Sequence, residues 1–162
     1  MTEIGENFLL FMLANMFLLK RYDFFQLFIA KLDIDIDQDP SKLNDLPVSD
    51  NFKGNFWRLR AMFMLKNLRR LDDKQISDYH FVRITKRLEL AERHYLKDDS
   101  AWGLGLTYHL FARIHSPQEI NSIVTLENIQ VSIDYYKKSL KWFLKCDHYR
   151  GLQMCCKSLY EI

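Results

Sequence analysis

The chain has 162 residues, of which 48% are hydrophobic and 14% aromatic, so it is a folded protein with room for one substantial core and not a disordered segment. Five Gly and three Pro are too few for the many turns of a β-sandwich or β-barrel. The net charge of +2 is unevenly distributed: residues 1–50 carry 4 Lys/Arg against 9 Asp/Glu, residues 51–97 carry 12 against 5, and residues 98–162 carry 7 against 7. We therefore predict a single all-α domain over residues 1–162 with a basic middle.

The N-terminal part predicts one helical hairpin over about residues 5–33. Its first helix contains the apolar run Phe8–Leu19, which is too short to span a membrane and has no basic segment before it. We therefore interpret the run as a buried helix and expect no membrane association. Residues 33–50 follow as an acidic connector, because alternating Asp residues and two Pro are typical of turns and loops.

Two further hairpins and a final helix are predicted after the connector. Ser49 or Asp50 can cap the first helix of a hairpin over residues 50–97, because a short oxygen-bearing side chain accepts hydrogen bonds from the free N–H groups of a first turn. A third hairpin spans residues 99–146, and its second helix opens after Thr125. The final helix covers residues 149–162.

An apolar skeleton recurs four times along the chain. Each copy has a large residue, then Leu or a substitute two places on, an aromatic six places on and an aliphatic eight places on, and the offsets between copies are about 46, 45 and 52 residues. Such a period is typical of stacked helical hairpins. The copies are Phe11/Leu13/Phe17/Leu19, Trp57/Leu59/Phe63/Leu65, Trp102/Leu104/Tyr108/Leu110 and Met154/Cys156/Tyr160/Ile162.

The second helices of the two later hairpins repeat as well, at a constant shift of 48 residues. A small residue, Ala91 or Ser139, stands three places after a bulky one in each copy and would let a facing helix approach closely. The matched positions are Ile84, Leu88, Ala91, Tyr95 in the first copy and Ser132, Tyr136, Ser139, Phe143 in the second.

This pattern resembles the tetratricopeptide repeat (TPR). Leu104-Gly105 with Tyr108 matches the first helix of that motif, and the two sets containing Ala91 and Ser139 match its second helix in residue type. The chain differs in having repeats longer than the usual length and no closing Pro, so HEAT-like and other α-solenoids are the structural alternative. The resemblance implies an α-solenoid of about three antiparallel hairpins plus a C-terminal helix, wound as a right-handed superhelix.

TPR-like arrays imply protein–protein binding through a groove lined by the first helices. The basic side chains that bind a C-terminal carboxylate in some TPR proteins would stand where Phe11, Trp57 and Trp102 stand, so we expect an apolar or aromatic anchor from the partner instead. For the tryptophans, core packing is the alternative to a binding role. The predicted groove residues are Asn15, Trp57, Ala61, Met64, Trp102, Leu106 and His109.

The basic middle segment offers a second candidate surface, either for an acidic protein partner or, as the less favoured reading, for nucleic acid. The alternative is a solvated helix face offset by nearby acidic residues. Arg87 and His94 also have the spacing of the catalytic pair in HEPN ribonucleases, which is the enzymatic alternative. The predicted patch consists of Arg58, Arg60, Lys66, Arg69, Arg70, Arg83, Lys86 and Arg87.

No catalytic, metal or cofactor site is predicted. The Asp33/Asp35/Asp37 alternation lacks the Gly and the final Glu of a calcium loop, and Cys146 with His148 has no second ligand pair at structural zinc spacing. The cysteines are odd in number and clustered near the C-terminus, which favours a reducing compartment, so we expect an intracellular protein, cytoplasmic or nuclear, without a small-molecule substrate.

Apolar side chains at both ends of the chain predict a terminal interface. A solenoid normally ends in a polar capping face, but the first and last helices both carry an excess of large apolar residues. We therefore expect an adaptor subunit that works in a homodimer or a hetero-complex. The residues of this predicted interface are Phe8, Phe11, Leu159, Tyr160 and Ile162.

Overall fold

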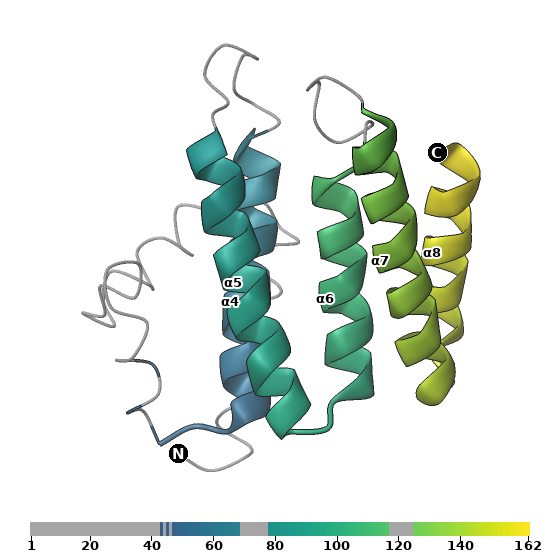
Figure 1. Cartoon of the computed structure of the whole chain (residues 1–162). Helices are drawn as coiled ribbons and strands as arrows, with labels where there is room; N and C mark the ends of the chain where they lie inside the picture. The colour runs from purple at the N-terminus through teal and green to yellow at the C-terminus, as the bar shows by residue number, and fades with distance from the viewer. Residues whose placement is uncertain (1–42, 44, 46, 69–77, 117–124) are drawn as a thin grey trace.

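The computed structural model describes residues 43, 45, 47–68, 78–116 and 125–162 (Figure 1). Within these ranges it contains five helices and no strand, which confirms the all-α prediction for this part of the chain. The predicted hairpin at 5–33 and nearly all of the acidic connector lie outside the described residues. The helices are α4 (Asp50–Leu68), α5 (Asp78–Lys97), α6 (Ala101–Ile114), α7 (Leu126–Lys145) and α8 (Tyr149–Glu161).

Four of these helices begin at residues whose side chains cap the first turn, and in α8 the cap is His148, whose Nδ1 accepts a hydrogen bond from the N–H of Gly151 at 3.0 Å. The hydroxyl oxygens of Ser49, Ser100 and Thr125 each accept a hydrogen bond from the backbone N–H three residues later, at 3.1, 3.4 and 3.1 Å. These bonds satisfy donors that have no partner within the helix. Ser49 and Thr125 are capping residues that the sequence predicted.

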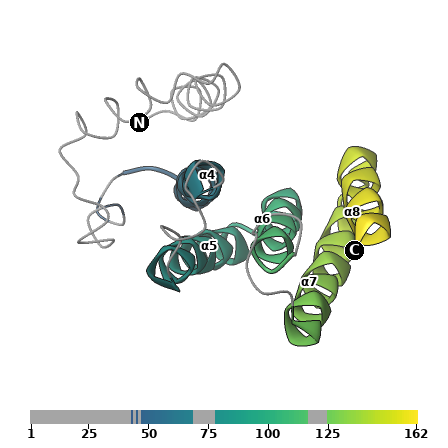
Figure 2. The same cartoon turned by 90° about the horizontal axis from the view of Figure 1, so that it is seen from above.

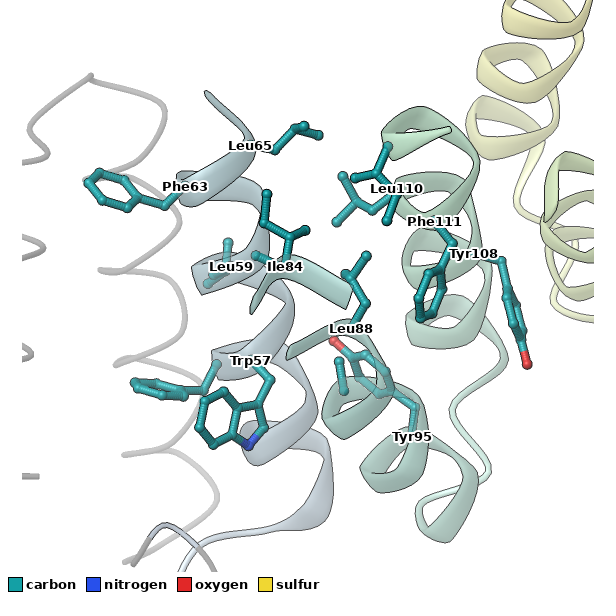
Figure 3. Close-up of a cluster of buried hydrophobic side chains, with 14 of the residues drawn as sticks. Trp57, Leu59, Phe63, Leu65, Ile84, Leu88, Tyr95, Tyr108, Leu110 and Phe111 are labelled. Carbon is teal, nitrogen blue, oxygen red and sulfur yellow. The ribbon is translucent and has the colours of Figure 1, made fainter. Parts of the chain in front are cut away.

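Helix α6 lies between the pair α4–α5 and the pair α7–α8 (Figure 2). The most extensive helix contacts are those of α4 with α5 and of α6 with α7, and α5 and α8 also pack against α6. The main core fills the space among α4, α5 and α6, where Ile84 and Leu88 of α5 lie between Leu59 of α4 and Leu110 of α6 (Figure 3). A smaller cluster joins α6, α7 and α8 through Ala112, Tyr136, Phe143 and Cys155.

Helix α4 is buried on nearly all of its faces. Its first half carries Phe52, Phe56 and Trp57 among residues that all have little exposure, so it has no apolar stripe opposed to a polar face. Trp57 and Ala61 are each 1% exposed. These two residues were predicted to line a surface groove, and they lie in the main core instead.

The corners that join α5 to α6 and α7 to α8 have the same backbone structure, 48 residues apart. Asp99 and Asp147 adopt positive φ angles of 47° and 51°. The N–H of the following residue bonds the carbonyl of Tyr95 in one corner and of Phe143 in the other, both at 2.9 Å. Together with the bond from each aspartate N–H to the carbonyl three residues earlier, this is a Schellman helix ending. The corner is thus a repeated structural unit.

The rings of Tyr95 and Phe143 occupy slots lined by glycine. A Cβ atom added to any of these glycines would stand between 2.3 and 2.8 Å from the nearest ring atom, which is closer than real Cβ contacts come. Each ring therefore depends on the absence of a side chain on two helices. Gly54 of α4 and Gly103 of α6 face Tyr95, while Gly105 of α6 and Gly151 of α8 face Phe143.

These contacts correct the predicted alignment of residues between α4 and α6, the first helices of the two predicted hairpins. Gly54 and Gly105 hold equivalent places beside their rings and are 51 residues apart, whereas the apolar skeleton paired Trp57 with Trp102 at 45 residues. The two tryptophans have different surroundings, since Trp57 is buried and Trp102 is 39% exposed. In α8 the skeleton positions Cys156 and Tyr160 are both exposed, and Cys155 is the residue that is buried.

Candidate binding pocket between α6 and α8

One face of α6 carries four residues at spacings of four, three and four positions. Trp102, Leu106, His109 and Arg113 therefore lie on the same side of the helix. Trp102 is 39% exposed, and Leu106 and Arg113 are half-buried. We call these four residues the α6 face.

Trp102 is held by cationic and aromatic neighbours. The guanidinium carbon of Arg58 lies 5.5 Å from the centroid of the Trp102 ring, and the His148 ring stands edge-on to it at 6.5 Å. Arg58 is itself fixed, because its Nε donates to the Tyr95 hydroxyl at 3.2 Å and its Nη2 to Asn55 Oδ1 at 3.0 Å. A cation over an indole face is attracted by the ring quadrupole. Trp102 is thus an exposed aromatic residue with a defined orientation.

A cavity of about 330 Å³ opens where the α6 face meets α8. Helix α8 contributes side chains at positions 154, 157, 158 and 161, which recur at helical spacing and so lie on one side. Tyr136 of α7 completes the wall. The lining residues of this α6–α8 pocket are His109, Arg113, Ser116, Tyr136, Met154, Lys157, Ser158 and Glu161.

Two hydrogen bonds fix α7 against α6 on either side of Tyr136. The Ser132 hydroxyl donates to the carbonyl of Ala112 at 2.9 Å, and the Ser139 hydroxyl donates to the carbonyl of Gly105 at 2.7 Å. Both serines are fully buried. Because their small side chains allow the two helices to approach, the phenol of Tyr136 is placed beside His109 with ring centroids 5.4 Å apart.

His109 is a buried histidine of the pocket wall, at 9% exposure. Burial, and secondarily the charge of Arg113, lower its pKa to about 4, so its imidazole is neutral at pH 7. Its Nε2 atom has no hydrogen-bond partner among the described residues. A buried ring nitrogen without a partner is costly and is suited to a ligand that supplies one.

The charged groups of the pocket are unequal in sign. Arg113 from α6 and Lys157 from α8 are cationic, and Glu161 is anionic. Lys157 Nζ lies 3.8 Å from Glu161 Oε1, and both side chains are substantially exposed, so water screens this contact. Positive charge therefore exceeds negative charge around a neutral His109.

No family model, curated protein or solved structure significantly matches the chain. Among the described helices none is long and apolar enough to cross a membrane. The described residues also contain no cluster of three or more His, Cys, Asp or Glu side chains that could hold a metal ion.

The predicted groove residues are divided between the core and the α6 face. Trp102, Leu106 and His109 come together on α6, as described above. Met64 is half-buried and packs against the main core, in the same helix as the buried Trp57 and Ala61. Asn15 lies outside the described residues. Among the predicted groove residues that the structure describes, the α6 face therefore holds the surface part, and it extends towards α8.

The predicted basic patch does not form one exposed surface. Arg58 and Arg87 are buried, and Arg87 Nη1 donates to the carbonyl of Arg83 at 2.7 Å within α5. Arg60 lies over the Phe56 ring and Arg83 over the Tyr79 ring, which directs their guanidinium groups to aromatic neighbours. Lys66 is half-buried and Lys86 is exposed. Arg69 and Arg70 lie outside the described residues.

Arg87 and His94, the pair with ribonuclease spacing, are both buried in α5. The Nδ1 atom of His94 lies 2.6 Å from Asp50 Oδ1, which links the end of α5 to the start of α4. Burial lowers the pKa of His94, while the Asp50 carboxylate opposes this effect. His94 thus has a structural partner in the core region.

The residues of the predicted terminal interface differ in exposure. Leu159 and Ile162 pack against the smaller cluster and are half-buried, whereas Tyr160 is 92% exposed. Phe8 and Phe11 lie outside the described residues.

Sequence reasoning missed most of the pocket wall. Arg113 could have been found, because it follows His109 by one helical turn on the same face. Lys157 and Glu161 share a face of α8, but that helix was interpreted only through its apolar positions. Nothing in the sequence indicates that Tyr136 of α7 lies beside them, since that contact depends on helix packing.

Proposed function

We propose that the chain is a TPR-like helical-repeat protein, in which antiparallel hairpins formed by α4 with α5 and α6 with α7 stack as part of a right-handed α-solenoid. The repeated Schellman corners and the two glycine slots support this assignment, because they recur in step with the 48-residue repeat of α5 and α7. Helix α8 continues the series as the first helix of a further unit.

The function that the geometry supports best is non-catalytic binding of a protein partner, with the chain as an adaptor subunit of a hetero-complex or homodimer. The observation that carries the proposal is the α6 face, on which the exposed, oriented Trp102 lies about two helical turns before His109 of the α6–α8 pocket. Tryptophan is among the few residue types that carry most of the binding energy at protein interfaces. A partner segment lying along the α6 face would meet Trp102, Leu106 and then the pocket.

The proposal is tested by capturing the tagged protein from its native cells and quantifying the proteins that co-purify. Trp102→Ala should reduce recovery of the specific partner at least about tenfold, since aromatic interface anchors contribute about 2 kcal/mol or more. Tyr79→Ala is the matched control, because Tyr79 is an exposed aromatic residue on α5 that neither belongs to the α6 face nor lines the pocket. Equal recovery with Trp102→Ala and Tyr79→Ala, with both variants folded, would refute the proposed binding face.

A further inference from the structure

Arg58 of α4 carries a buried positive charge beside the exposed Trp102. Arg58 is 9% exposed, and its guanidinium carbon lies 5.5 Å from the centroid of the Trp102 ring. Its Nε and Nη2 atoms donate to neutral acceptors, the hydroxyl of Tyr95 and the amide oxygen of Asn55. Within the described part of the chain Arg58 makes no ion pair. Because a guanidinium group does not lose its charge in proteins, this charge is buried without a counter-ion.

A buried charge without a counter-ion is suited to a ligand that supplies one. Removing a charged group from water is costly, and neutral partners offset this cost less than an opposite charge does. The carboxylates at the start of α4 and at the α5–α6 corner have other partners. Asp50 Oδ1 lies 2.6 Å from His94 Nδ1, and Asp99 Oδ1 accepts a hydrogen bond from Lys145 at 3.0 Å. The charge of Arg58 is therefore available to an incoming anion.

Part of the Arg58 guanidinium can be reached by a ligand. The Nη1 atom makes neither of the two bonds described above. The described side-chain atoms that are fully enclosed and lack a hydrogen-bond partner are Arg87 Nε and His109 Nε2, and Nη1 of Arg58 is not among them. Nη1 therefore reaches the surface, next to the Trp102 ring. An oxygen atom that arrives there can accept a hydrogen bond while the bonds of Arg58 to Tyr95 and Asn55 remain.

The surroundings of Arg58 favour a carboxylate that follows or precedes an apolar side chain. A carboxylate matches the planar guanidinium and accepts a charge-assisted hydrogen bond, which is about twice as strong as a neutral one. The single charge of Arg58 balances a carboxylate more closely than a phosphate group of about two charges. The adjoining apolar surface is formed by Trp102, which is 39% exposed, and by the half-buried Leu106 one turn further along α6.

We propose that Arg58 recognises an acidic residue of the partner: its unbonded guanidinium N–H groups bind the side-chain carboxylate of a Glu or Asp in the partner segment, beside the apolar residue of that segment that contacts Trp102. This inference rests on the proposed function of the α6 face as a surface for a partner segment.

The experiment is an NMR titration of the isotope-labelled full chain with N-acetyl-Leu-Glu N-methylamide, using the Leu-Gln analogue as the uncharged control. The glutamate probe should bind in the millimolar range and shift the Nε–H signal of Arg58 and the indole N–H signal of Trp102. It should bind at least about fivefold more tightly than the glutamine probe, because only the carboxylate accepts a charge-assisted bond. Arg58→Gln should abolish this preference, since it removes the charge.

Three further variants separate binding by Arg58 from its part in packing. Arg58→Lys keeps the charge and should retain a preference for the glutamate probe, which gives a result even if Arg58→Gln does not fold. Tyr95→Phe removes the hydroxyl that holds Arg58 but leaves the guanidinium, so it should weaken glutamate binding less than Arg58→Gln does. Lys137→Gln, on an exposed face of α7, should leave the affinity unchanged.

Equal binding of the glutamate and glutamine probes, or no shift of the Arg58 and Trp102 signals by either, overturns the carboxylate assignment. An unchanged preference for glutamate in Arg58→Gln overturns it as well. Tighter binding of the matching phosphoserine probe, or of N-acetyl-Leu-Ala with a free terminal carboxylate, overturns it in favour of a phosphate or of a chain end. If Arg58 fails these tests while Trp102→Ala still loses the partner, the proposed function survives; if the glutamate probe binds at Arg58 and Trp102→Ala retains the partner, the proposed function fails alone.

Discussion

The rings of Tyr95 and Phe143 fit between helices only because glycine stands opposite each of them. The added Cβ at Gly105 would lie 2.6 Å from a carbon of the Phe143 ring, and the ring is itself fully buried. A ring carbon near the base of an aromatic side chain cannot move aside as the tip of a flexible chain can. Steric fit at these positions therefore outweighs the helix propensity that alanine would add.

We predict that Gly105→Ala lowers the free energy of unfolding by about 1–2 kcal/mol, because overpacking costs about 1–3 kcal/mol and exceeds the propensity gain of roughly 1 kcal/mol. Phe143→Leu removes the ring that the new methyl group meets. The double variant should therefore be more stable than the sum of the two single effects predicts, as measured by urea denaturation of all four proteins. Additive effects would show that the slot does not constrain the packing.

His109 makes stability depend on pH. Its pKa is about 4 in the folded protein against 6.5 when unfolded, so the unfolded chain binds more protons between these values. The stabilisation is fully present above about pH 6.5 and is lost as pH falls through about 4. Burial lowers the pKa values of His94 and His115 as well, which adds to the loss in the same direction.

We predict that the free energy of unfolding falls between pH 6.5 and pH 4, with His109 contributing at most about 3 kcal/mol at 1.36 kcal/mol per pKa unit. Denaturation of the parent and His109→Gln at several pH values measures this contribution as the difference between the two profiles. The variant should have the flatter profile, and Lys137→Gln should follow the parent. Parallel profiles for His109→Gln and the parent would contradict the low pKa.

At the residue scale, part of the site could be predicted from the sequence. Leu106 and His109 were assigned to a surface on α6 from their place beside the apolar skeleton, and they lie on the α6 face. Trp57 received the same assignment but is buried, because α4 is covered on nearly all faces and its sequence carries no amphipathic pattern to reveal this. Exposure of a tryptophan depends on what packs beside its helix, which a local pattern does not contain.

At the scale of elements, α5 and α7 each bury a small residue at a matched position. Ala91 and Ser139 occupy matched positions and are both fully buried. The difference between them is one hydroxyl, which in α7 donates to the carbonyl of Gly105 and contacts the Cys155 sulfur at 3.1 Å. Size is therefore the property that the two positions share.

We predict that Ala91→Ser and Ser139→Ala each change the free energy of unfolding by about 1 kcal/mol or less, the value of one buried hydrogen bond. Leucine at either position should cost about 2–3 kcal/mol, because it separates two packed helices. Thermal and urea denaturation measure these effects, and Lys137→Leu controls for an added apolar side chain on an exposed face of α7. A tolerated leucine at one position alone would show that the two helices are not equivalent copies.

The places where helices begin could be predicted more closely than the alignment of equivalent residues between one helix and the next. Ser49, Thr125 and the 48-residue shift of α5 and α7 are local signals, and the structure contains the corresponding caps and repeated corners. The register of α4, α6 and α8 was assigned from large apolar residues alone, although the packing depends on where glycines meet rings. A missing side chain leaves no hydrophobic signal, so the offset of 51 between Gly54 and Gly105 was not found.

At the scale of the whole molecule, the pocket is a product of stacking. Its wall combines residues of three helices: Arg113 lies near the end of α6, Tyr136 lies in α7, and Glu161 is the last residue of α8. No single helix forms the pocket. Tyr136 lines it because the hydrogen bonds of Ser132 and Ser139 hold α7 against α6. The same stacking leaves Trp102 exposed on the face of α6 that carries His109 and Arg113 of the pocket wall.

The most direct test of this account is a photo-crosslinking measurement in native cells, with a diazirine amino acid placed at Met154 in the pocket wall or at Lys137 on the exposed face of α7. The account predicts a defined protein crosslinked from position 154 and little or none of that protein from position 137. Crosslinking of the same protein with equal yield from both positions, or from position 137 alone, would contradict binding at the α6–α8 pocket.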